Sequence, residues 1–335
     1  MAIPLDSIPR FAAAQAQAVA LEDYGIEGRA SALPSERDQN FLIVGSRGAK
    51  FVLKIANRDE APEWLDFQNQ AMRRVAASAC HCRVQEIVPT RIGADLGEIR
   101  DRVSGVHHCV RVTTWLPGQV LAKCTERGAV LSASVGTCMA RIDAALRDFE
   151  HPAMHRLLQW DLRHAGLARE HVELLTPARR ARVEQVFADW ETIDWTGLRH
   201  GVIHNDANDH NVLVEDGRMT GLLDFGDLVH SAIVCDPAIA LAYALLHQSE
   251  PLATAAALMR AYHRHHPLTD HEQRALYPLM LARLASSVCY AAHNRARNPD
   301  DAYQVVTEAA AWKLLDVLER YPPAAAAAVI REACV

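Results

Sequence analysis

The hydrophobic pattern changes its period twice near the start of the chain. Alanine-rich residues from Phe11 to Asp23 carry apolar side chains at helical spacing and predict an opening helix. The segments Asn40 to Val44 and Phe51 to Ile55 are rich in β-prone residues and are joined by a glycine-containing turn, which predicts a hairpin. Side chains alternate along a strand, so Lys54 shares one face with Val52 while Phe51, Leu53 and Ile55 share the other.

A helical period returns after Asp59. Pro62 suits a first turn, and an apolar stripe follows it, formed by Trp64, Leu65, Phe67, Ala71, Met72 and Val75. Strand-like segments come next at Glu86 to Arg91 and at Cys109 to Leu116, and the second ends in the turn Pro117–Gly118. Beyond that turn the pattern predicts helices at residues 129–146, 178–191, 236–247, 252–265, 272–291 and 301–319.

This order of elements predicts an α+β chain with two lobes. Residues 1–28 supply an N-terminal helix that packs on the lobes. Residues 29–117 form a small antiparallel sheet with one crossing helix, and residues 118–335 form a larger, mainly helical lobe. A chain of 335 residues with 50% hydrophobic residues is long enough to bury the cores of two such lobes.

Charge and apolar segments narrow the class of protein. A net charge of −6 argues against nucleic acid as the main partner, since phosphate binding needs a concentrated basic surface. The longest apolar segments, such as Ala238 to Leu246, are shorter than the roughly 20 residues of a spanning helix, and the first residues lack the basic and apolar regions of a signal peptide. The eight cysteines show no CxxC pair, which predicts reduced thiols and no zinc site. We therefore expect a cytoplasmic protein that binds a small molecule and not a membrane.

A second hairpin interrupts the helical half. The strands Val212 to Val214 and Met219 to Leu223 flank Asp216 and Gly217, two residues that tolerate positive φ in a tight turn. Pairing Val214 with Met219 and Leu213 with Thr220 leaves Asn211 and Asp224 at the same open end. At about 3.3 Å per residue both side chains could reach one ion. An amide oxygen and a carboxylate suit Mg²⁺, which takes its remaining ligands from water and phosphates.

The loop before this hairpin carries a candidate base. Asp206 stands five residues before Asn211 on an irregular segment, where a carboxylate could reach a hydroxyl beside a metal-bound phosphate. His204 and Asn208 flank it and are expected to brace the loop. With Lys54 as a cation for phosphate, these residues are the parts required for phosphoryl transfer. Asp236, which precedes Pro237, is predicted to cap the helix that follows.

Three motifs together resemble the aminoglycoside phosphotransferase family. They are the HxDxxxxN loop at residues 204–211, Asp224 within LLDFGD, and Lys54 within FVLKI, and the resemblance covers about residues 30–320. It implies a bilobal fold similar to that of eukaryotic protein kinases, with nucleotide bound by the first lobe. It also implies that Asp206 is the base, that Asn211 and Asp224 hold Mg²⁺, and that Lys54 contacts the α and β phosphates.

Within the family the sequence is most similar to the hydroxylysine kinase branch, through SERDQNFLI, FQNQAM and WDL. The resemblance implies that the nucleotide is covered by Ser35, Asp38, Gln39 and Asn40 and that its base edge is held by Thr114, Trp115 and Leu116. Two features depart from the protein-kinase pattern. No GxGxxG precedes the Lys54 strand, and Gln68, with Glu63 and Asp66 as neighbours, stands where a helix normally offers a glutamate to that lysine. The acidic partner of Lys54 stays open.

The acceptor is expected to be a hydroxylated amine or amino acid. Arg283 could bind a carboxylate through its planar fork, and Asp161 or Asp227 could bind an amine. Each carboxylate also has a structural interpretation, as a cap for backbone amides, and Trp160 is either core packing or part of the acceptor pocket. Hydroxylysine is the preferred acceptor. Aminoglycosides, homoserine, choline and other amino alcohols are the alternatives.

A different class of function is a catalytically silent regulator with the same fold, which the absent GxGxxG and the open partner of Lys54 favour. Phosphate transfer from a nucleotide, with an Asp206 variant as control, separates the two hypotheses. The sequence leaves open whether the donor is ATP or GTP and whether the chain forms a homodimer.

Overall fold

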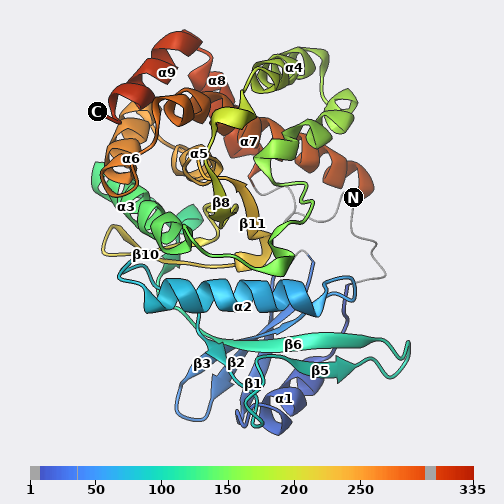
Figure 1. Cartoon of the computed structure of the whole chain (residues 1–335). Coiled ribbons are helices and arrows are strands. Elements are labelled where there is room, and N and C mark those ends of the chain that lie inside the picture. The colour runs from blue at the N-terminus through green and yellow to red at the C-terminus, as the bar shows by residue number, and fades with distance from the viewer. Residues whose placement is uncertain (1–7, 36, 299–306) are drawn as a thin grey trace. The chain divides into compact units, whose positions relative to one another are not determined.

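The computed structural model describes residues 8–35, 37–298 and 307–335, which fold into two compact units (Figure 1). Unit 1 comprises Met1–Ala77 and Val84–Pro117, and unit 2 comprises Ser78–Arg83 and Gly118–Val335. One break falls between Pro117 and Gly118, whereas the assignment of residues 78–83 to unit 2 has no signal in the hydrophobic pattern. An α+β architecture is confirmed, with most of the strands in unit 1 and most of the helices in unit 2.

Unit 1 contains one antiparallel sheet and two helices. Its elements are α1 (Ala13–Glu22), β1 (Gly28–Leu33), β2 (Gln39–Gly45), β3 (Lys50–Ile55), α2 (Pro62–Ala77), β4 (Ile87–Val88), β5 (Gly97–Arg100) and β6 (His107–Thr114). The strand order is β1-β2-β3-β6-β4, and β5 also pairs with β6. In the register, Lys54 of β3 lies between Asn40 of β2 and Arg111 of β6, so these three polar side chains share one face of the sheet.

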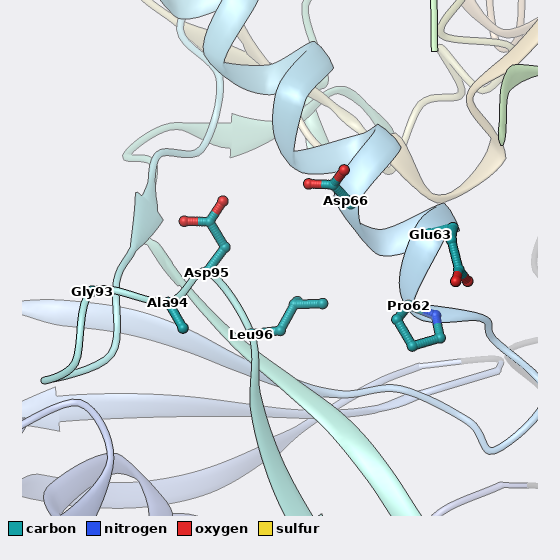
Figure 2. Close-up of a pocket in the computed structure, with 7 residues that line it drawn as sticks. All are labelled: Pro62, Glu63, Asp66, Gly93, Ala94, Asp95 and Leu96. Carbon is teal, nitrogen blue, oxygen red and sulfur yellow. The ribbon is translucent and has the colours of Figure 1, made fainter. Parts of the chain in front are cut away.

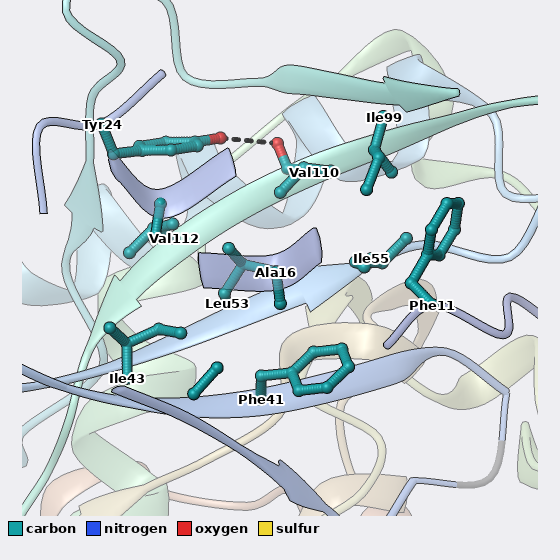
Figure 3. Close-up of a cluster of buried hydrophobic side chains, with 12 residues drawn as sticks. Phe11, Ala16, Tyr24, Phe41, Ile43, Leu53, Ile55, Ile99, Val110 and Val112 are labelled. Carbon is teal, nitrogen blue, oxygen red and sulfur yellow. Dashed lines mark hydrogen bonds between the residues drawn. The ribbon is translucent and has the colours of Figure 1, made fainter. Parts of the chain in front are cut away.

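The opposite face of this sheet carries the core of unit 1. Leu53 and Ile55 of β3 pack with Phe41 and with Ala16 of α1 in one buried cluster (Figure 3). The Tyr24 hydroxyl, just after α1, donates a 2.8 Å hydrogen bond to the Val110 carbonyl of β6. The alternation predicted for β3 is therefore confirmed, and α1 is part of the core of unit 1.

Several short strands were not predicted. β1 buries only Ala30 among its six residues, and β5 buries only Ile99 among its four, so neither shows an alternating apolar pattern. The strand expected at Glu86 to Arg91 is reduced to two residues, Ile87–Val88. Strands of this kind form because a neighbouring strand offers backbone partners, and that information is not local in the sequence.

Unit 2 is mainly helical. Its elements are β7 (Gln119–Val120), η2 (Leu121–Lys123), α3 (Ala129–Leu146), η3 (Pro152–Met154), η4 (Leu162–Leu174), α4 (Pro177–Glu191), η5 (Trp195–Gly197), β8 (His200–Ile203), β9 (Val212–Glu215), β10 (Arg218–Leu222), η6 (Phe225–Asp227), β11 (Val229–Ala232), α5 (Cys235–Ala244), α6 (Pro251–His265), α7 (Asp270–Arg297), α8 (Glu308–Leu318) and α9 (Pro323–Glu332), where η marks a 3-10 helix. The helix α3 packs on α6, and α7 packs on α4, α5, α8 and α9. Two small sheets, β10-β9-β7 and β11-β8, lie among these helices.

The helices predicted in this half are present, with shifted ends. The expected helix at 272–291 extends over Asp270–Arg297, and a capping box of Thr269 and Glu272 sets its start. Of the helix expected at 301–319, Glu308–Leu318 is observed, and residues 301–306 lie outside the described residues. The helix α9 was not predicted.

By length and composition, α3 and α7 could cross a membrane, although the apolar segments considered in the sequence were too short. Their apolar windows are 56% and 83% buried inside the fold, as expected for core helices, so this feature is weak evidence for a membrane protein.

Close contact between α3 and α6 depends on Gly136. A Cβ atom at this position would lie 2.1 Å from the Leu258 carbonyl oxygen of α6. We expect Gly136→Ala to force the two helices apart and to lower the free energy of unfolding by about 2–3 kcal/mol. Urea unfolding measures this difference. Gly128→Ala, at the start of the same helix and with open space around it, is the matched control and should cost less than about 1 kcal/mol. Equal losses in the two variants would contradict the close-contact argument.

Candidate active site

The β9–β10 hairpin of unit 2 places Asn211 and Asp224 at the same end of its two paired strands. Asp216 and Gly217 have φ values of 50° and 70°, as a two-residue turn of this hand requires. A β-bulge at Thr220 shifts the predicted register, so that Leu213 pairs with Gly221 and not with Thr220. The Leu223 amide then donates to the Asn211 carbonyl at 2.8 Å, which places Asn211 opposite the residue that precedes Asp224.

The donor set at this end of the hairpin fits a hard divalent cation. The Asn211 amide donates its Nδ2 to the Asp206 carbonyl oxygen at 3.0 Å and to Asp206 Oδ2 at 2.8 Å, which leaves its Oδ1 as the atom for a cation. Asp224 adopts a left-handed conformation (φ 57°), and its Oδ1 accepts from the Gly226 amide at 3.0 Å. One amide oxygen and one carboxylate suit Mg²⁺ with phosphate and water ligands. Among the described residues, no group of three or more His, Cys, Asp or Glu could hold a metal ion.

Asp206 is held by three donors. Its Oδ2 accepts from Asn208 Nδ2 at 2.9 Å and from Asn211 Nδ2, and its Oδ1 accepts from Arg283 Nη2 at 2.8 Å. The side chain keeps 18% of its surface exposed, so a substrate hydroxyl can reach it. Burial raises the pKa of Asp206 to about 8, and the Arg283 guanidinium acts in the opposite direction.

His204 and Asn208 hold the loop in place, as a bracing role requires. The fully buried His204 donates Nε2–H to the Leu223 carbonyl at 3.1 Å and accepts the Asp206 amide on Nδ1 at 3.2 Å, which assigns the tautomer. Burial lowers the pKa of His204 and so favours this neutral form. The Asn208 side-chain oxygen accepts from the His210 amide at 2.8 Å and the Asn211 amide at 3.1 Å.

Asp236 holds the same loop through two backbone amides, a role that the sequence analysis missed. The helix α5 begins at Cys235, so Asp236 lies inside the helix and is not its N-cap. Its fully buried carboxylate accepts from the His204 amide at 2.9 Å and from the Asn205 amide at 2.6 Å. An aspartate at the start of an otherwise apolar helix was the available signal, and it was interpreted as a cap.

A second buried acid, Asp143 of α3, lies against Asp236. Burial and the neighbouring Asp236 raise the pKa of Asp143 well above its usual range, and the Tyr262 hydroxyl donates to its Oδ2. No donor within the described residues reaches Oδ1 of Asp143. Burial therefore favours the neutral, protonated form of Asp143.

Two of the predicted acceptor residues serve the fold instead. Asp161 is fully buried and accepts from the Arg163 amide, from the Arg163 guanidinium at 2.7 Å and from the Ser231 hydroxyl at 2.7 Å, so its interpretation as a binder of an amine is wrong. Arg283 is 2% exposed and bound to Asp206, so it cannot present its fork to a substrate carboxylate. Half-buried Trp160 and buried Asp227, in η6 directly after Asp224, remain predicted acceptor residues.

In unit 1, Lys54 is half-buried on the polar face of the sheet. Gln68 of α2 does not take the place of a glutamate paired with Lys54. Its side-chain Oε1 accepts from Arg111 Nη2 at 2.6 Å, and its Nε2 donates to Glu60 Oε1 at 3.1 Å. Asn69 Oδ1 accepts from the same guanidinium at 3.1 Å. The helix α2 therefore offers neutral amide oxygens to the guanidinium of Arg111, the neighbour of Lys54 in the sheet.

Three side chains predicted to contact the nucleotide have hydrogen-bond partners within unit 1. The Gln39 amide exchanges two hydrogen bonds with the Phe11 backbone, at 2.7 and 2.8 Å, and Asp38 Oδ1 accepts from the Asn57 backbone amide and side chain. These side chains join segments of unit 1. The Thr114 hydroxyl likewise accepts from the Glu86 amide at 3.0 Å. The seven residues stay predicted nucleotide contacts: Ser35, Asp38, Gln39, Asn40, Thr114, Trp115 and Leu116.

An open depression of about 590 Å³ on unit 1 is lined by Pro62, Glu63, Asp66 and residues 93–96 (Figure 2). Two of its three acids have partners in the protein, because Asp95 binds the Arg73 guanidinium and Asp66 accepts from Gln70 at 2.7 Å. None of the predicted site residues lines it, so it is not the candidate active site.

Known proteins resemble this chain over most of its length. A family model described as "Phosphotransferase enzyme family" matches residues 29–277. Hydroxylysine kinase of Mus musculus is 30% identical over 345 aligned positions, which cover 92% of this chain and 90% of that protein. Homoserine kinase of Nitrobacter winogradskyi is 29% identical and covers 72% of each chain. The structure of amicoumacin kinase hAmiN in complex with AMP-PNP, Ca²⁺ and Ami has a TM-score of 0.71 at 14% identity, over 93% of this chain and 95% of that one.

These matches confirm the family resemblance and the kinase-like fold predicted from the three motifs. The matched region contains the Lys54 strand, the Asp206 loop and the hairpin that carries Asn211 and Asp224. Because the family model spans well over half of the chain, this protein belongs to the phosphotransferase enzyme family.

Proposed function

We propose that this phosphotransferase is a small-molecule kinase that transfers the γ-phosphoryl group of a nucleoside triphosphate to a hydroxyl group of a hydroxylated amino acid, with hydroxylysine as the first candidate. The observation that carries the proposal is the Asp206 carboxylate, partly exposed and joined by hydrogen bonds to Asn211. A base beside a cation ligand is the arrangement that phosphoryl transfer to an alcohol needs.

Each residue has a defined role in the proposed reaction. Asn211 Oδ1 and the Asp224 carboxylate would hold Mg²⁺, which neutralises charge on the phosphates when bound. Lys54 would contact the phosphates of the nucleotide. The substrate oxygen forms a bond to the γ-phosphorus while the bond from that phosphorus to the bridging oxygen breaks. Asp206 accepts the hydroxyl proton, and the nucleoside diphosphate leaves.

Hydroxylysine is preferred over homoserine because of the extent of the match. The hydroxylysine kinase of Mus musculus covers 92% of this chain, whereas the homoserine kinase covers 72%. Both acceptors carry a hydroxyl, an amine and a carboxylate. Asp227 is the remaining candidate for the ammonium group, since the carboxylate of Asp161 already binds Arg163 and Ser231. We assign no residue to the substrate carboxylate, because the fork of Arg283 is occupied within the protein.

Phosphate transfer to a panel of acceptors tests the proposal. We expect Mg²⁺-dependent transfer from ATP or GTP to hydroxylysine, with a higher kcat/KM than for homoserine, choline or an aminoglycoside. Asp206→Asn is the control, and it should lower kcat by about 10²-fold because it removes the proton acceptor and keeps the shape. Nucleotide binding without transfer to any acceptor would instead support the silent regulator.

A further inference from the structure

A single guanidinium in the interior of unit 2 contacts the candidate base. Arg283 lies in the middle of α7 and is 2% exposed. Its Nε donates to the Tyr243 hydroxyl at 3.2 Å, its Nη1 to the Trp160 carbonyl at 3.1 Å, and its Nη2 to Asp206 Oδ1 at 2.8 Å. The guanidinium carbon also lies 4.5 Å from the Trp160 ring centre and 5.4 Å from that of Tyr243. All three nitrogens and both neighbouring rings fix the group in one position.

The three donors around Asp206 leave its two oxygens unequal. A carboxylate oxygen has two lone pairs in its plane. Both lone pairs of Oδ2 are matched by the side-chain amides of Asn208 and Asn211, whereas Oδ1 receives only the Arg283 guanidinium among the donors of the described residues. The second lone pair of Oδ1 is therefore the place where the carboxylate can accept another proton. Arg283 binds the same oxygen that would receive the substrate hydroxyl.

We propose that Arg283 is a positioning residue that orients Asp206 so that Oδ1 faces the acceptor hydroxyl. The inference rests on the proposed function, and it replaces the expectation that this arginine binds the substrate. Without the guanidinium, the buried side of the carboxylate has no counter-ion, and rotation of the carboxylate toward water becomes favourable. Misplacing a reacting group by about 1 Å can cost about 10²-fold in rate.

A comparison of three variants tests the role. We expect Arg283→Met to lower kcat by about 10²-fold with little change in the KM for nucleotide or acceptor, since the group touches neither. Arg283→Lys should restore part of kcat, because it keeps the charge and loses the planar fork. Arg295→Met, which removes an ion-paired arginine of the same helix, exposed and bonded to Glu308, is the matched control and should keep wild-type kcat.

The double variant Asp206→Asn/Arg283→Met separates positioning from general stability. If Arg283 acts through Asp206, the double variant should be no slower than Asp206→Asn alone. The double variant also lacks an uncompensated buried carboxylate, so it provides a readout if Arg283→Met alone fails to fold. Losses that multiply in the double variant, an unchanged kcat in Arg283→Met, or a raised acceptor KM with unchanged kcat would overturn the proposal. Failure of the proposed function gives a different result: the wild-type protein itself would transfer phosphate to no acceptor, and both proposals would then be overturned.

Discussion

Asp224→Asn is expected to reduce kcat/KM for the metal–nucleotide complex by about 10³-fold, equivalent to about 4 kcal/mol. The substitution removes the only full negative charge of the two proposed Mg²⁺ ligands, Asn211 and Asp224. It keeps the side-chain oxygen that accepts from the Gly226 amide, and asparagine tolerates the positive φ of 57° at this position. A magnesium titration of nucleotide binding and of transfer rate measures the loss, which higher Mg²⁺ should partly recover.

The other end of the same hairpin offers a matched control. Asp216 is exposed in the turn at a φ of 50°, so Asp216→Asn removes a carboxylate from the hairpin without a change in conformation. Its Mg²⁺ dependence should equal that of the wild-type protein. A magnesium titration that Asp224→Asn leaves unchanged would remove Asp224 from the proposed metal site.

Local sequence patterns predicted the parts of the site that depend on local structure. The Asp216–Gly217 turn was predictable because two successive residues with positive φ favour one kind of hairpin. The face of Lys54 followed from strand alternation. The bulge at Thr220 could not be predicted, since an extra residue in one strand depends on contacts with the surrounding structure.

The main features that the sequence did not predict are contacts between residues far apart in the chain. Arg283 and Asp206 are separated by 77 positions, and neither residue type identifies the other as its partner. The same holds for Asp236 and the His204 amide, 32 positions apart. In both cases helical packing decides which polar group meets which. A sequence does not give the burial of a side chain. It therefore cannot distinguish an arginine that binds a substrate from one that is buried against an acid.

Asp236→Asn is expected to destabilise the protein by about 3 kcal/mol and to lower kcat by about 10²-fold. Each oxygen of Asp236 accepts one backbone N–H of the catalytic loop, from His204 and from Asn205. An asparagine offers one acceptor and places its own N–H group against the second amide, which leaves two buried donors facing each other. Urea unfolding and transfer kinetics together measure the two losses.

Asp143→Asn is the matched control, because it changes the other acid of the same buried pair. Burial favours the neutral form of Asp143, and an asparagine is neutral and has nearly the same shape, so we expect a cost of less than about 1 kcal/mol. The pH dependence gives a second test. Burial holds the pKa of Asp143 above its ordinary value of about 3.9, so the unfolded chain loses this proton at lower pH than the folded protein does. The wild-type protein therefore loses stability from this group as the pH rises above about 4, and Asp143→Asn should lose less between pH 5 and 8. Equal sensitivity of activity to substitution at 143 and 236 would mean that the pair, and not the two loop amides on Asp236, holds the catalytic segment.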